Sequence, residues 1–98
     1  MGANKKLSAL LAGRTVDNTS TAGKEMRIKF ADDSQLIIQL GEGTEEPPFH
    51  GDVVEGIVQN GIIFTLNMVD GRSRRILLED ACSSVMLRNK NNQVEYTD

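Results

Sequence analysis

The amino-acid sequence predicts an all-β domain: a small antiparallel barrel or sandwich of about six to eight short strands, with a short N-terminal helix. Three observations lead to this fold class. Apolar and polar residues alternate over short runs, turn-forming Gly, Asn and Asp residues separate the runs, and the sequence resembles itself at a fixed shift. A chain of 98 residues corresponds in size to a single domain with one hydrophobic core.

The self-similarity relates two segments of equal length. Residues 13–40 align without a gap on residues 51–78, and six of 28 positions are identical. We interpret the two segments as a duplicated three-stranded meander. The predicted organisation is an N-terminal helix at 1–12, a first β unit at 13–40, a linker at 41–50, a second β unit at 51–78 and a terminal hairpin at 79–98.

The N-terminal helix is expected over residues 4–12. Three leucines recur at helical spacing, at positions i, i+3 and i+4: Leu7, Leu10 and Leu11. Gly13 follows them and is suited to end a helix. The segment therefore predicts one short amphipathic helix.

The first β unit contains three predicted strands. The first strand, Thr15–Ser20, leads into a turn that ends at Gly23. The second strand alternates apolar with polar residues, which places one face on the core: Met26, Ile28 and Phe30. A turn at Asp32 and Asp33 then leads to the third strand, Gln35–Leu40.

The second β unit repeats this pattern after a linker that contains Pro47 and Pro48. Its first and third strands are expected over residues 53–58 and 74–78. An Asn60-Gly61 pair between the first two strands is a strong hairpin signal. The second strand again has one apolar face: Phe64, Leu66 and Met68. Beyond this unit, residues 84–88 and 93–96 flank a polar turn and predict the terminal hairpin.

The charges are unevenly distributed along the chain. The net charge is −3, and residues 31–71 contain eight acids and no Lys or Arg. Nucleic-acid-binding domains usually carry a basic excess, so the composition argues against a nucleic-acid partner. The alternative is a weak single-stranded nucleic-acid-binding barrel, which requires the third strand of the second unit to lie beside the terminal hairpin. Its binding residues would be an arginine cluster: Arg72, Arg74, Arg75 and Arg88.

The sequence indicates no membrane segment, and we expect a cytoplasmic protein. The longest apolar stretches have four or five residues, whereas a spanning helix needs about twenty. The apolar stretch within residues 1–12 is too short for a secretory signal. The single cysteine, Cys82, fits a reducing compartment.

Catalytic and metal-binding motifs are absent from the sequence. His50, the one histidine, lies beside Asp52 and is the starting point for an acid–base or metal hypothesis. A zinc site ordinarily needs three or four Cys or His ligands, which this segment lacks. Cys82 would be a nucleophile only if a neighbouring base lowered its pKa. We therefore predict no enzyme, no metal and no cofactor.

Several predicted strands carry apolar residues on both faces. Ile37 and Ile63 each lie between two apolar residues, so they are expected to point away from the core. The N-terminal helix, the linker or another subunit must cover them, and the sequence leaves these possibilities open. The leading hypothesis is a non-enzymatic protein-binding or assembly module that uses exposed apolar strand residues, Ile37 and Ile63, with a protein partner or as a homodimer.

Overall fold

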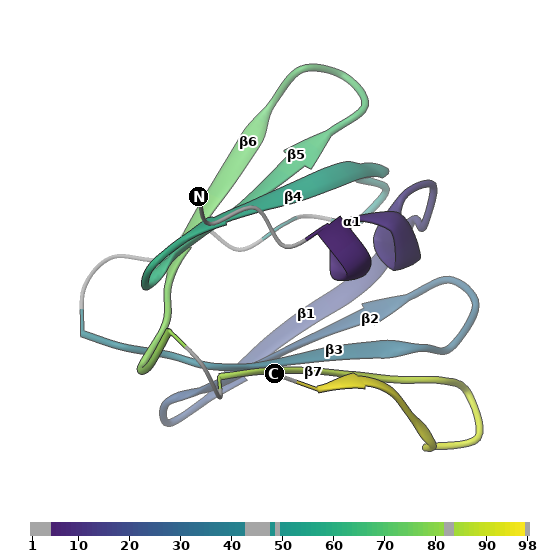
Figure 1. Cartoon of the computed structure of the whole chain (residues 1–98). Coiled ribbons are helices and arrows are strands. Elements are labelled where there is room, and N and C mark those ends of the chain that lie inside the picture. Colours follow the sequence, from purple (N-terminus) through teal and green to yellow (C-terminus); the bar gives the residue numbers. More distant parts are fainter. Residues whose placement is uncertain (1–4, 43–47, 49, 82–83, 98) are drawn as a thin grey trace.

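A computed structural model of the chain describes residues 5–42, 48, 50–81 and 84–97 (Figure 1). Over these residues it contains one helix and eight strands. Their order is α1 (Lys5–Leu11), β1 (Val16–Ala22), β2 (Glu25–Phe30), β3 (Gln35–Gln39), β4 (Val54–Asn60), β5 (Ile63–Met68), β6 (Ser73–Leu77), β7 (Val85–Arg88) and β8 (Val94–Thr97). The elements predicted from the sequence are present, and their ends differ by at most two residues.

The strands form two antiparallel sheets that face each other. One sheet has the order β1-β2-β3-β7-β8 and the other has the order β4-β5-β6. Two isolated bridges, Thr15–Val53 and Leu40–Leu78, connect the sheets. The all-β prediction is confirmed, and of the two architectures left open the structure is a sandwich and not a closed barrel.

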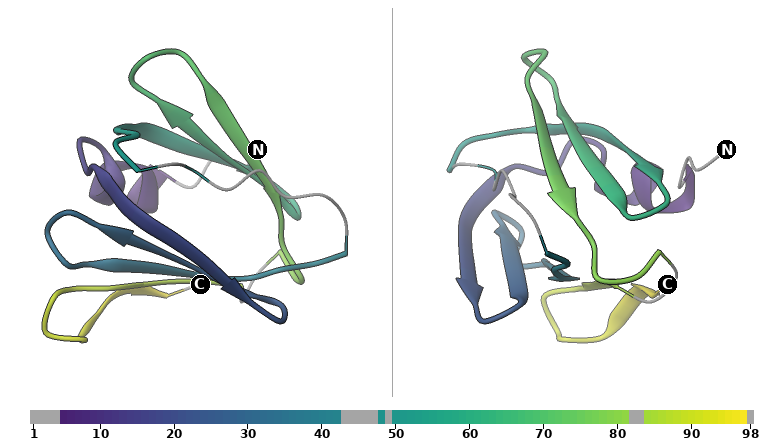
Figure 2. Two further views of the ribbon diagram at one scale, coloured as in Figure 1. Left: turned by 180° about the vertical axis from the view of Figure 1, so that it is seen from behind. Right: turned by 90° about the vertical axis from the view of Figure 1, so that its left-hand side faces the viewer.

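The helix α1 lies between the sheets at the end where they diverge, as two further views show (Figure 2). Leu7 and Leu11 are completely buried in the core. Ser8 Oγ accepts a 2.9 Å hydrogen bond from the backbone N of Ile57 in β4. The helix therefore covers part of the inside of the sandwich, and Ile63 on the outside stays 40% exposed.

One hydrophobic core fills the space between the sheets, with contributions from α1, both meanders and β7. The predicted alternation is confirmed in β2 and β5, where every second residue is buried and the residues between them are at least partly exposed. The buried residues of these two strands are Met26, Ile28, Phe30, Phe64, Leu66 and Met68. The period of two thus sets the inner face of each meander.

The two meanders have the same construction. Each strand of β4-β5-β6 begins and ends 38 residues after its counterpart in β1-β2-β3, for instance at Val16 and Val54. The register shifts at the same place in both, after Val16 and after Val54. The turn before the third strand contains a residue with positive φ in each case, 70° at Asp33 and 93° at Gly71.

The terminal hairpin extends the first sheet. β7 pairs with β3, from Ile38–Val85 to Gln35–Arg88. β3 has three consecutive buried residues and becomes a central strand, with β2 on one side and β7 on the other. The hairpin does not lie beside β6 in the other sheet, so the arrangement that the nucleic-acid alternative required is wrong.

Candidate functional site

The outer face of β4-β5-β6 and the turn between β4 and β5 carry three of the five large, exposed apolar side chains of the described residues. Val58 on β4 is 47% exposed, Ile63 on β5 is 40% exposed, and Ile62 in the intervening turn is 46% exposed. Ile63 pairs with the half-buried Leu77 of β6. Val58 lies diagonally across from Ile63, close enough for the side chains to interact. We call Val58, Ile62, Ile63 and Leu77 the apolar patch.

The equivalent positions of the first meander are polar. Thirty-eight residues before the four members of the apolar patch stand Ser20, Lys24, Glu25 and Gln39. Glu25 accepts hydrogen bonds from Arg27 Nε at 2.6 Å and from Gln39 Nε2 at 3.3 Å. These bonds hold the pKa of the Glu25 carboxyl below its usual value. The same backbone therefore presents a charged network in one sheet and apolar side chains in the other.

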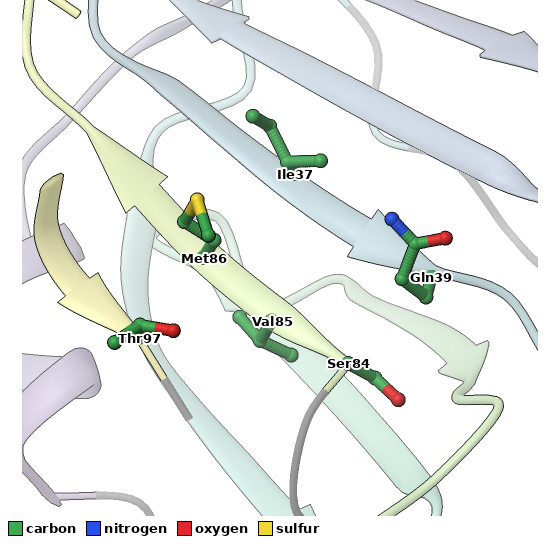
Figure 3. A pocket seen from close by; sticks show the side chains of 6 residues that line it. All are labelled: Ile37, Gln39, Ser84, Val85, Met86 and Thr97. Carbon is green, nitrogen blue, oxygen red and sulfur yellow. The ribbon is translucent and has the colours of Figure 1, made fainter.

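Ile37 was expected to be exposed, and this expectation is wrong: it is only 9% exposed. It lies on the outer face of β3 between its paired residues, Arg27 of β2 and Met86 of β7. Its side chain lines a hollow of about 90 Å³ (Figure 3), and the other lining residues are Gln39, Ser84, Val85, Met86 and Thr97. The low exposure of Ile37 is explained by the neighbouring strand β7, which no sequence pattern placed beside β3.

The structure divides the predicted arginine cluster between two sheets. Arg72, Arg74 and Arg75 precede or lie on β6, whereas Arg88 ends β7 and donates a 2.8 Å hydrogen bond to the Asn92 carbonyl oxygen. Arg74 lies 3.4 Å from the Asp52 carboxylate, and both side chains are largely buried. Arg72 lies 3.5 Å from Asp70. Arg72 and Arg74 are thus in ion pairs within the protein.

His50 and Asp52 do not form the pair that an acid–base site would need. His50 is exposed, and its Nδ1 lies 2.7 Å from the backbone oxygen of Asp17, whereas Asp52 contacts Arg74. Among the described residues, no group of three or more His, Cys, Asp or Glu could hold a metal ion. Cys82 lies outside the described residues.

A polar cluster around Arg14 was missed at the level of sequence. Arg14 Nη2 donates to Glu95 at 2.9 Å, Nη1 donates to Ser34 Oγ at 2.6 Å, and Nε donates to the Leu10 carbonyl oxygen at 2.9 Å. Asp32 lies 3.3 Å from the same guanidinium. The cluster joins α1, the β2–β3 turn and β8, which are far apart in sequence. Only the turn-forming Asp32 was recognisable beforehand.

The pKa of Asp32 results from opposing effects. Burial raises it, but hydrogen bonds from the Ser34 side chain and backbone, with the charge of Arg14, outweigh burial and leave the pKa below the usual 3.8. These bonds stabilise the turn and the ionised carboxylate together. The cluster therefore stabilises the packing of α1, the β2–β3 turn and β8 against one another.

No protein-family model, curated protein or solved structure matches this chain. Within the described part of the chain, α1 is much too short to cross a membrane. The apolar patch is therefore the feature on which a function can be argued, because its exposure has no counterpart in the equivalent meander.

Proposed function

We propose that this protein is a non-enzymatic association module, in which a second copy of the chain docks on the outer face of β4-β5-β6. The observation that carries the proposal is the contrast between the apolar patch and the polar residues at the equivalent positions. Glu25 and Lys24 are compatible with the same backbone conformation, so packing within the chain does not require Ile63 and Ile62. The apolar residues are explained by contact with another molecule.

The charges of this face favour a second copy as the occupant. Glu55 on β4 and Arg75 on β6 are exposed and have opposite signs. Arg75 lies on the same cross-strand row as Val58 and Thr65. Two copies of this face thus carry no net charge of the same sign against each other. The first sheet differs, since Arg27 and Lys29 outnumber Glu25 there.

The size of the face predicts a weak dimer. Three strands about 4.8 Å apart and about 20 Å long cover roughly 300 Å², well below the roughly 800 Å² that each partner buries in a standard interface. Full burial of a Val or Ile is worth about 1.5–3 kcal/mol, and three side chains a little under half exposed give about 4–8 kcal/mol for two copies. This only offsets an association cost of about 4–15 kcal/mol.

Ile63→Glu tests the proposal, because it introduces the residue that the first meander has at the equivalent position. We expect the wild-type molar mass by light scattering to rise with concentration and the variant to remain a monomer. Val94→Ser is the matched control, since Val94 is 48% exposed on the other sheet. A variant that associates as the wild type does, or a control that fails to associate, would contradict the proposal.

Two further interpretations belong to this proposal. The matching meanders are proposed to be an internal repeat of one ancestral β unit, which the identical positions at a shift of 38 residues support. We also propose a cytoplasmic location, which the composition supports because a single cysteine stays reduced there.

A further inference from the structure

The contact between the two meanders has an unusual form. The two bridges that join them pair Thr15 with Val53 and Leu40 with Leu78. In each bridge a residue pairs with its own equivalent 38 positions later. Such self-pairing is what a two-fold axis produces in a dimer of identical subunits, where the same surface meets itself.

The backbone hydrogen bonds at one end of the contact are reciprocal. Gly13 N donates to Val54 O at 2.7 Å, and the equivalent Gly51 N donates to Val16 O at 2.8 Å. A second pair of bonds follows the same rule, from Val16 N to Asp52 O at 2.7 Å and from Val54 N to Arg14 O at 2.9 Å. Each bond is thus accompanied by its two-fold counterpart.

The other end of the contact repeats this arrangement. Gly41 N donates to Leu77 O at 2.9 Å, and Glu79 N donates to Gln39 O at 3.0 Å. At both ends of the contact, each bond therefore has a counterpart between the equivalent residues of the other unit. Any antiparallel bridge has a reciprocal pair of bonds around it, so the informative feature is that both bridges join residues 38 positions apart.

The core side chains at two pairs of equivalent positions are exchanged between the units. Position 26 holds Met and its equivalent 64 holds Phe, whereas position 30 holds Phe and its equivalent 68 holds Met. All four belong to one core and are at most 1% exposed. Each unit thus contributes one Phe and one Met in opposite order, which keeps the total volume constant.

From these observations we infer that the contact between the meanders is a two-fold interface between equivalent β units, so that the partner each unit fits is a second unit of its own kind. The chain is a fused dimer of that unit. α1 and the β7–β8 hairpin are additions that break the symmetry, since α1 packs on β4 and β7 pairs with β3. This inference is independent of the association through the apolar patch.

Exchange of the core residues tests the inference without a change in composition. The first-unit exchange combines Met26→Phe with Phe30→Met, and the second-unit exchange combines Phe64→Met with Met68→Phe. Either exchange alone gives both units the same order, so that large side chains coincide at one pair of equivalent positions. We expect each to lower the urea midpoint of unfolding. The four-site exchange restores the opposite order, and we expect a smaller loss than in either two-site variant.

Urea unfolding of the full-length variants is followed by far-UV circular dichroism. A four-site loss equal to the sum of the two separate losses would overturn the inference, because each unit would then respond independently. Unchanged midpoints in both two-site variants would also overturn it, since the units would be insensitive to what faces them. If a two-site variant fails to fold, recovery of a cooperative transition in the four-site variant supports the inference, and failure of both contradicts it.

Discussion

The two meanders share one backbone design and differ mainly in what they present to solvent. Their inner residues are apolar in both, as at Ile28 and Leu66. Their outer residues differ in kind, with Glu25 in a hydrogen-bonded network and Ile63 exposed at the equivalent place. Packing therefore accounts for the inner residues of both meanders but not for the exposed apolar residues of the second, for which we propose association.

The largest loss of stability is expected for a substitution at Gly41. The equivalent position 38 residues later holds Glu79, so the two meanders differ here. A Cβ at Gly41 would overlap the carbonyl oxygen of Leu78, which is backbone and cannot move aside cheaply. We expect Gly41→Ala to lower the free energy of unfolding by about 2–3 kcal/mol in urea titrations. Glu79→Ala is the control, with an expected change within about 0.5 kcal/mol because Glu79 is exposed. Equal effects of the two substitutions would show that the close approach at Gly41 is not required.

A smaller loss is expected where α1 contacts the second meander. Ser8→Ala removes the acceptor of the Ile57 backbone N–H. An unsatisfied, partly buried N–H should lower the free energy of unfolding by about 1 kcal/mol. Ala9→Ser on the exposed side of α1 is the control and should change it by less than about 0.5 kcal/mol. A neutral Ser8→Ala variant would mean that water replaces the hydroxyl.

The smallest of the three effects concerns pH. Because the folded-state pKa of Asp32 is lowered, its contribution to stability is present above the unfolded value near 3.8 and is lost as pH falls through the folded value. Asp32→Asn should therefore flatten the fall in thermal midpoint below about pH 4. Since the Asp32 side chain is 56% exposed, we expect an effect under about 1 kcal/mol. If the thermal midpoint of Asp32→Asn falls as steeply below about pH 4 as that of the wild type, the stabilising role of the Asp32 carboxylate would be contradicted.

The sequence predicted the local structure well and the long-range placement poorly. Alternation identified the buried faces of β2 and β5, and Asn60-Gly61 marked a hairpin correctly, because both signals act between near neighbours. The position of β7 beside β3 depends on which sheet edge accepts a strand, and no local pattern specifies that. The prediction for Ile37 failed for this reason, whereas Ile63 is exposed as expected because β5 has its neighbours within its own meander.

The central claim is that the apolar patch serves association, and sedimentation equilibrium of the wild-type protein tests it most directly. The measurement should cover a wide range of protein concentration at low and at high salt. The account predicts a reversible monomer–dimer equilibrium that is insensitive to salt, since apolar burial drives it. A strict monomer at the highest concentration, or a dimer that disappears as salt rises, would contradict the account.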